Sequence, residues 1–383
     1  MTDYKEEFGD IAPYSEQEAL EAISRLARHP MTPTISKYLF PEEKRDYLSR
    51  ALLSVKSLDE YQETVMGSVV DWVIESSVKD FTYDGIENVK SIDGKFLAMS
   101  NHRDIVLDPA FTQYILIRNG IPPTEIAVGD NLLSSKSVEY MLRSNRMIKV
   151  IRGISARELY LSSQYLSRYI RYAITSGHSS VWIAQRQGRT KDGMDVTEQG
   201  LLKMFDMSGT KSFKENFLEL NILPISISYE YEPCDVRKAR EVLISRTQKY
   251  VKKRNEDTHS IIMGIRQPKG NVHLHFGEPL TETEIEAASL CDRNDRYQWI
   301  RKVVTERIVS GYKLFKTNYL CYDLVNGTSK YASEYTAEDV ENFKAYTEHR
   351  LDKVERKLDR DELRDIFYRI YANPVIAKEN LGK

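Results

Sequence analysis

The sequence predicts an α/β fold in which a sheet lies between helices and helical regions extend the domain at both ends. Two observations carry this prediction. Short apolar runs alternate with longer helical patterns through the middle of the chain, which is typical of α/β layers. Near both ends, apolar residues instead recur at helical spacing. We therefore divide the chain into an amino-terminal helical region (residues 1–80), an α/β domain (residues 81–330) and charged carboxyl-terminal helices (residues 331–383).

Capping patterns predict helices in the amino-terminal region. Ser15 is followed three residues later by Glu18, which is the pattern of a capping box, and Ser57 and Glu60 repeat it. Apolar residues follow both pairs at helical spacing. The sequence therefore predicts that a helix begins at each of these two serines.

Seven short apolar runs, several of them next to a glycine, predict the strands of the α/β domain. In order they read "FTYDGIENV", "KFLAMSNH", "EIAVGDN", "MIKVIRG", "SSVWIAQ", "NILPISISYEY" and "NVHLHFGEPL". Longer helical patterns separate many of them, for example over residues 157–175. After Ser333 the chain becomes helical and highly charged, and the acidic residues there favour packing on the main domain over binding to a membrane surface.

Composition excludes several classes of protein. The 55 basic and 57 acidic residues nearly balance, which gives no general reason to expect nucleic-acid binding. No apolar run approaches the roughly 20 residues of a membrane-spanning helix, and the acidic amino terminus lacks the pattern of a secretory signal. Cys234, Cys291 and Cys321 form no CxxC pair, and His273 and His275 have no evident third ligand. We therefore expect a cytoplasmic protein without a metal site.

The stretch "FLAMSNHRDIVLDPAF" places polar residues where an apolar run ends. It is open to two interpretations: His102 caps the helix that follows, or it is a base held by Asp104 or Asp108. The letters "HRD" also occur in the catalytic loop of protein kinases. A kinase would need asparagine where this chain has Pro109, and no glycine-rich loop or DFG motif accompanies the segment. The kinase interpretation is therefore excluded.

Four segments together resemble the ordered motif blocks of the glycerolipid acyltransferase superfamily. They read "NHRDIVLDPAF", "VGDNLLSSKSVEYMLRSNRMIKVIRG", "VWIAQRQGRTKDG" and "ILPISISYEYEP", and the likeness covers roughly residues 80–330. The resemblance implies a central mixed sheet flanked by helices. It also implies transfer of a fatty acyl group from coenzyme A or acyl carrier protein to a hydroxyl of a glycerol phosphate or lysophospholipid. No metal or bound cofactor is implied, and peripheral contact with the inner face of a membrane is expected.

The resemblance makes His102 the catalytic base and Asp108 the carboxylate that orients it. The family places four residues between histidine and aspartate, whereas here five separate His102 from Asp108 and one separates it from Asp104. Because Pro109 follows Asp108, as in the family, we expect Asp108 to be the partner, with a one-residue insertion, and Asp104 to form a solvated pair with Arg103. Both aspartates remain candidates at this point.

For the acceptor, the resemblance implies Arg152, Gln187, Gly188 and Arg189. Arginine binds phosphate through a bidentate fork, which suits a phosphorylated acceptor. The family has a glutamate where this chain has Gln187, so restoring glutamate there is expected to raise turnover. The alternative hypothesis is a catalytically impaired homologue that binds lipid or acyl carrier protein. A serine hydrolase is disfavoured because no GxSxG motif is present.

Overall fold

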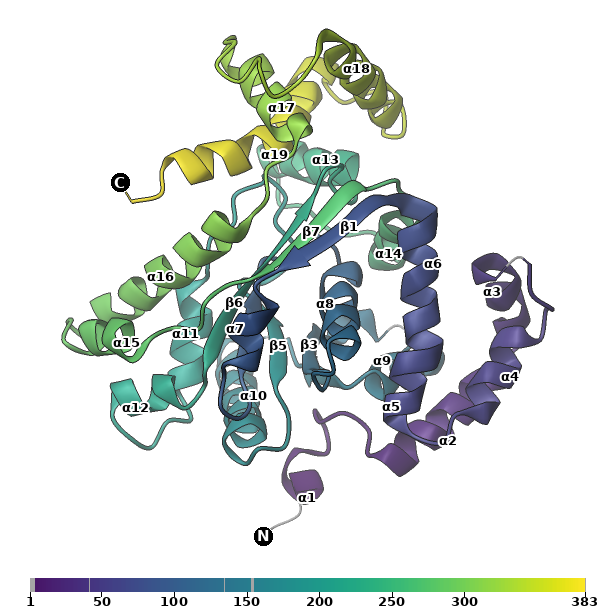
Figure 1. Cartoon of the computed structure of the whole chain (residues 1–383), viewed down its shortest axis with the longest axis vertical. Coiled ribbons are helices and arrows are strands. Elements are labelled where there is room, and N and C mark those ends of the chain that lie inside the picture. Colours follow the sequence, from purple (N-terminus) through teal and green to yellow (C-terminus); the bar gives the residue numbers. More distant parts are fainter. Residues whose placement is uncertain (1–3, 41, 134, 153–154, 383) are drawn as a thin grey trace.

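A single seven-stranded sheet forms the centre of the computed structural model, which describes every residue except 1–3, 41, 134, 153–154 and 383 (Figure 1). The strand order is β1-β7-β6-β2-β5-β3-β4. The strands are β1 (Val78–Asp84), β2 (Leu97–Ser100), β3 (Glu125–Gly129), β4 (Met147–Val150), β5 (Val181–Ala184), β6 (Ile222–Tyr229) and β7 (Gly270–Phe276). Each of the seven predicted runs contains all or most of one strand.

The sheet is mixed, as predicted. Strands β6, β2, β5, β3 and β4 run parallel to their neighbours in this order. Strand β7 pairs antiparallel with β6, and β1 pairs parallel with β7. The carboxyl ends of the five parallel strands therefore lie along one edge of the sheet, which is where ligands bind in open α/β sheets. Strand β2 lies inside this group, and its four residues are all buried.

Helices cover both faces of the sheet because side chains alternate along each strand. Leu97 and Met99 of β2 belong to a core packed with α10, α11, α12, α15 and α16. Ala98 belongs to a second core, on the other face, packed with α6, α7 and α8. The bounds of these helices are α6 (Gly67–Ser77), α7 (Ile86–Lys90), α8 (Leu107–Arg118), α10 (Ala156–Thr175), α11 (Gln199–Asp206), α12 (Phe213–Leu218), α15 (Glu282–Ser289) and α16 (Asp295–Gly311).

The amino-terminal region is helical, as predicted. Ser15 and Glu18 form the predicted capping box of α2. Ser57 caps α5, but the Glu60 side chain accepts from the backbone N–H of Lys56 instead of closing a second box. The elements here are α1 (Tyr4–Phe8), α2 (Glu16–Ala27), α3 (Thr32–Leu39), α4 (Tyr47–Ser54), α5 (Leu58–Glu60) and the π-helix η1 (Tyr61–Met66).

Four further elements complete the α/β part of the chain. Two of them lie between β3 and β4 in the sequence, and two lie between β6 and β7. Their bounds are η2 (Asp130–Leu132), α9 (Lys136–Ser144), α13 (Asp235–Ser245) and α14 (Glu256–Arg266).

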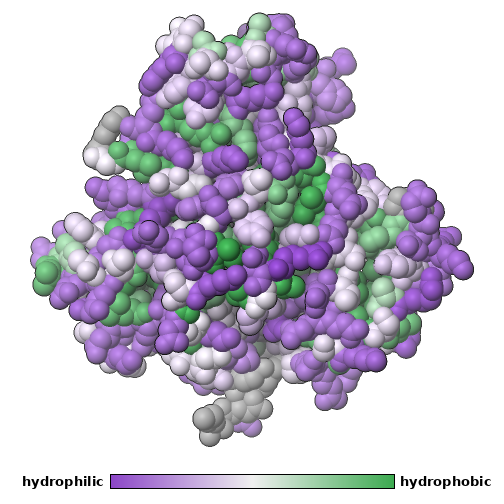
Figure 2. All heavy atoms as spheres, in the orientation of Figure 1, coloured by the Kyte–Doolittle hydropathy of each residue, from purple (hydrophilic) through white to green (hydrophobic). Residues whose placement is uncertain are grey.

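The carboxyl-terminal helices pack on the main domain, as the sequence predicted. They are α18 (Ala337–Leu351) and α19 (Arg360–Glu379), together with α17 (Lys316–Asn326), which lies before the predicted boundary at residue 331; all three are at the top of Figure 1. Helix α19 packs against α17 and against α13, which follows β6, and together with α18 they form a separate hydrophobic core. The face of the molecule shown in Figure 2 is mostly hydrophilic, with hydrophobic side chains in small separate patches. No helix in the described part of the chain is long and apolar enough to cross a membrane.

Candidate active site

His102 lies directly beyond the carboxyl end of the buried strand β2. Its Nδ1 atom is 3.0 Å from Oδ2 of Asp108, and the His102 side chain keeps 15% exposure while that of Asp108 has none. The ring of Trp182 packs edge-on against the imidazole, with 6.2 Å between the two ring centres. No described residue hydrogen-bonds Nε2 of His102, so this atom is available to a ligand.

The backbone of the loop after β2 explains how five intervening residues bring Asp108 back to His102. Asp108 is the second residue of α8, and its Oδ2 accepts from the backbone N–H groups of Arg103 at 2.6 Å and Asp104 at 2.9 Å. Its Oδ1 accepts from the Tyr229 hydroxyl at 2.8 Å. Burial and the neighbouring carboxylate raise the pKa of Tyr229, which keeps this hydroxyl a donor. Four donors therefore fix the carboxylate, and Pro109 occupies the first turn of α8, where proline is tolerated.

The Asp104 side chain serves the helix instead. Its Oδ1 accepts from the backbone N–H groups of Val106 and Leu107, both at 2.9 Å, which is how a side chain caps a helix. Its Oδ2 is buried against Gly264 of α14 and has no hydrogen-bond partner among the described residues. The solvated pair of Asp104 with Arg103 that the sequence predicted is wrong, because both side chains are almost completely buried.

Arg103 is part of a buried ionic cluster that sequence reasoning missed. Its guanidinium pairs with Asp195 at 2.6 Å and Glu232 at 3.3 Å, and lies 4.9 Å from the ring centre of Tyr312. The Lys238 ammonium bridges Glu232 and the Arg103 carbonyl, both at 2.6 Å. These partners fix the backbone next to His102. The available signal was that Glu232 is a carboxylate shortly after the end of β6, whereas Asp195 lies well beyond the end of β5 and gave no such signal.

The third motif block forms the loop after β5 and is joined to the His102 loop. The Thr190 N–H donates to the carbonyl of His102 at 2.7 Å. Gly188 has φ 76°, a left-handed conformation that favours glycine. Gln187 is exposed, and its backbone N–H donates to Oε2 of Glu198 at 3.0 Å. A carboxylate that the sequence comparison did not reveal therefore lies beside the position of the missing glutamate.

Arg189 is partly buried beside Asp104. Burial alone would lower the pKa of Arg189, but the Cys234 sulfur and the Asp104 carboxylate raise it above the ordinary value. One terminal nitrogen, Nη1, is buried without a hydrogen-bond partner among the described residues. A buried guanidinium nitrogen without a partner is costly, so an anion at this position would satisfy it.

Arg152, after β4, is exposed and forms no hydrogen bond or ion pair with a described residue. Its guanidinium lies over Gly129 at the end of β3, where Asn131 also lies. Asn131 donates to Asp257 of α14 at 3.0 Å. Against the effect of burial, the pKa of Asp257 is lowered mainly by its pair with Lys252, and to a smaller extent by Asn131 and Arg189. A chain of near neighbours therefore connects the two predicted phosphate-binding arginines along the carboxyl-end edge of the sheet.

His273 and His275 are two residues apart on β7 and share Asp84 of β1. Nε2 of His273 is 3.5 Å and Nδ1 of His275 2.5 Å from Oδ1 of Asp84. Nδ1 of His273 also pairs with the Thr82 hydroxyl at 2.8 Å. Among the described residues, no group of three or more potential ligands is arranged to hold a metal ion.

Comparison with known proteins agrees with the motif blocks. A glycerol-3-phosphate acyltransferase of Pseudomonas fluorescens (strain Pf0-1) is 27% identical over 211 residues, which cover 53% of this chain and 24% of that protein. One from Pseudomonas syringae pv. tomato is 25% identical over 266 residues, covering 66% and 30%. At this low identity, the chain resembles glycerol-3-phosphate acyltransferases over half to two thirds of its length. It spans less than a third of the length of these curated relatives.

Two further comparisons complete the set. No protein-family profile matches the chain. The crystal structure of the 1-acyl-sn-glycerophosphate acyltransferase PlsC from Thermotoga maritima aligns with 78% of this chain and 98% of its own, with 14% identity and a TM-score of 0.37.

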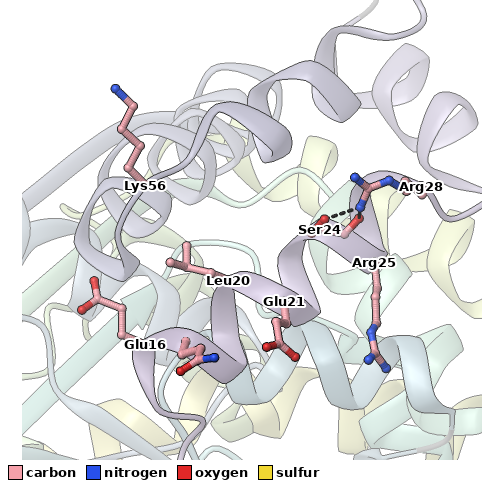
Figure 3. Close-up of a pocket in the computed structure, with 8 residues that line it drawn as sticks. Glu16, Leu20, Glu21, Ser24, Arg25, Arg28 and Lys56 are labelled. Atoms are coloured by element: carbon pink, nitrogen blue, oxygen red, sulfur yellow. Dashed lines mark hydrogen bonds between the residues drawn. The ribbon is translucent and has the colours of Figure 1, made fainter.

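A hollow on the amino-terminal region is separate from the candidate active site around His102. Figure 3 shows it lined by side chains of α2, including Glu16, Leu20 and Arg25, with Lys56 on the opposite side. None of its lining residues belongs to the motif blocks.

Proposed function

We propose that this acyltransferase homologue is an active enzyme that moves a fatty acyl group from an acyl thioester to a hydroxyl of a glycerol phosphate or lysophospholipid. The observation that carries the proposal is the pairing of His102 with Asp108 at the carboxyl end of β2. In this reaction Nε2 of His102 removes the proton of the acceptor hydroxyl while its oxygen attacks the thioester carbonyl. The proton then passes to the departing thiolate.

Asp108 has a defined part in this mechanism. Its carboxylate accepts from Nδ1–H of His102, which leaves Nε2 unprotonated and able to act as a base. Its negative charge also stabilises the imidazolium that forms during proton transfer, without taking the proton itself. Arg189 and Arg152 would hold the acceptor phosphate, and the buried unpaired Nη1 of Arg189 supports this role.

An acyl-transfer assay tests the proposal. Radiolabelled acyl-coenzyme A and acyl carrier protein thioesters are each offered with glycerol-3-phosphate, lysophosphatidic acid and unphosphorylated glycerol. We expect transfer to a phosphorylated acceptor, and a loss of about 10²-fold or more in His102→Ala. Near-normal turnover of His102→Ala would contradict the mechanism.

The alternative is a binding module without turnover. It would be supported by saturable binding of an acyl thioester without transfer to any acceptor. Gln187, which replaces the family's glutamate, is the feature in its favour. The Glu198 carboxylate beside Gln187 weakens this argument for a binding module, because the loop still has an acidic side chain there.

A further inference from the structure

A basic hollow lies between α13, α14 and the turn that follows α18. It combines a stretch that follows the fourth motif block with residues about a hundred positions further along the chain. Its lining contains six cationic residues and two acidic ones, Glu256 and Glu355. The cations are Arg237, Arg240, Lys253, Arg254, Arg350 and Lys353.

Both acidic residues of the hollow already have partners. Glu355 accepts from Nε and Nη2 of Arg240 at 2.7 and 2.6 Å, and its pKa is lowered to about 2 by this hydrogen-bonded pair. Glu256 accepts from the Tyr250 hydroxyl at 2.6 Å and from the backbone N–H of Lys253 at 3.0 Å. Glu355 offsets Arg240, whereas the two donors to Glu256 are neutral and leave its negative charge in the hollow. The lining still carries more positive than negative charge, because six cations face two acids.

Three of the cations have no such partner. Arg237, Arg254 and Lys353 make no side-chain hydrogen bond or salt bridge with a described residue, and Arg237 acts on Glu256 only at longer range. Arg350, in contrast, is paired with Asp235 at 2.7 Å. Unpaired cations on the walls of one concavity add their fields and favour a ligand with several negative charges.

The remaining walls suit an organic ligand. Tyr250, Ile262, Met263 and Val354 supply ring and aliphatic surface next to the cations. Small-molecule sites combine apolar walls with a few polar groups that fix orientation. Arginine forks are well suited to phosphate oxygens.

We propose that this hollow binds an organic polyphosphate, with Arg237, Arg254 and Lys353 holding its phosphate groups. Resting on the function proposed above, the ligand is the nucleotide end of a coenzyme A thioester donor. This identification also predicts that coenzyme A, in preference to acyl carrier protein, carries the acyl group.

Helix α14 relates the hollow to the candidate active site. Glu256, His259 and Met263 face the hollow, whereas Asp257 contacts Asn131 and Gly264 packs on Asp104. At about 100° per residue the centres of these two sets lie about 120° apart around the helix. The hollow and the Asp104 side of the active site are thus separated by somewhat less than one helix diameter, which is roughly 10–12 Å. The long pantetheine arm of coenzyme A could connect a nucleotide here with a thioester near His102.

The binding test uses adenosine 3′,5′-bisphosphate and isothermal titration calorimetry with the full chain. We expect saturable binding that is weakened about 10-fold or more in the double variant Arg237→Ala/Arg254→Ala, because two charge-assisted contacts are lost. Arg293→Ala, which removes an exposed arginine elsewhere, should leave binding unchanged. Absence of saturable binding, an unaffected double variant, or equal competition by inorganic pyrophosphate would overturn the assignment of an organic polyphosphate.

A kinetic test identifies the source of the polyphosphate. In the double variant, KM for acyl-coenzyme A should rise several-fold while kcat stays the same. If bisphosphate binding is lost but KM does not change, the ligand is a free nucleotide and the donor assignment is wrong. If the wild-type chain transfers no acyl group, the proposed function fails, and the calorimetry still decides whether the hollow is a polyphosphate site.

Discussion

Asp108→Asn separates the charge of the orienting residue from its geometry. The structure predicts which way the new amide turns, because Oδ2 of Asp108 faces two backbone N–H groups, those of Arg103 and Asp104. An NH₂ group at that position would face two donors. We therefore expect the amide oxygen of the new asparagine to occupy the position of Oδ2. The NH₂ group then faces Tyr229, whose hydroxyl can rotate to accept. Nδ1–H of His102 keeps an acceptor, and the tautomer should be retained.

What the variant loses is the negative charge beside the imidazolium. Two unit charges about 4 Å apart interact by about 4 kcal/mol at an effective dielectric constant of about 20. Each 1.36 kcal/mol corresponds to about a tenfold change in rate, so the full value would cost about 10³-fold. His102 retains some solvent contact, which reduces the interaction. We therefore expect kcat to fall by about 10² to 10³-fold with little change in KM.

The assay is steady-state acyl transfer by purified protein, with a thermal melt to confirm folding. Two matched variants serve as controls. Tyr229→Phe removes one donor but keeps the charge of Asp108, and should change kcat by less than about tenfold. Asp104→Asn keeps the helix cap, because asparagine caps as well as aspartate, and should have a similarly small effect. If Asp104→Asn costs more than Asp108→Asn, Asp104 is the functional partner and the reasoning fails.

Three further predictions test other parts of the molecule. Replacing Arg152 or Arg189 with leucine should cost about 1.5–3 kcal/mol in kcat/KM for a phosphorylated acceptor, and an equal loss with glycerol would show that they support structure instead. Gln187→Glu should not raise turnover, contrary to the expectation from sequence, because it adds a second carboxylate near Glu198; a faster variant in the same assay would refute this. Burial lowers the pKa of Lys269 from 10.5 to about 8, so the unfolded chain binds this proton more strongly and the free energy of unfolding should rise between those pH values. In urea unfolding at pH 8 and 9.5, the free energy of unfolding of Lys269→Met should rise less with pH than that of the wild-type chain. An equal rise in both would mean that Lys269 stays charged in the folded protein.

The strands could be predicted from sequence because each is a local pattern. A buried strand reads as a short apolar run, and the four residues Leu97–Ser100 illustrate this. The partner of His102 could also be anticipated, because Pro109 follows Asp108 as a proline follows the orienting aspartate of the family. The strands needed only neighbouring residues, whereas the partner of His102 also needed the resemblance.

The environment of Arg103 and Asp104 could not be predicted in this way. Whether a charge is buried depends on partners distant in the sequence, here Asp195 and Glu232 for Arg103. A solvated pair of adjacent opposite charges was the local expectation. The same limit applies to Glu198, which approaches Gln187 only because the loop after β5 folds back.

The donors around Asp108 make the role of His102 testable. Of the four hydrogen bonds that the carboxylate accepts, only one comes from His102, whereas two come from backbone N–H groups and one from Tyr229. Removing the imidazole therefore leaves three donors on Asp108. The buried pairing of Arg103 also remains and fixes the adjacent backbone. A loss of turnover in His102→Ala would thus report the missing base, because the loop that carries it is stabilised independently of the histidine.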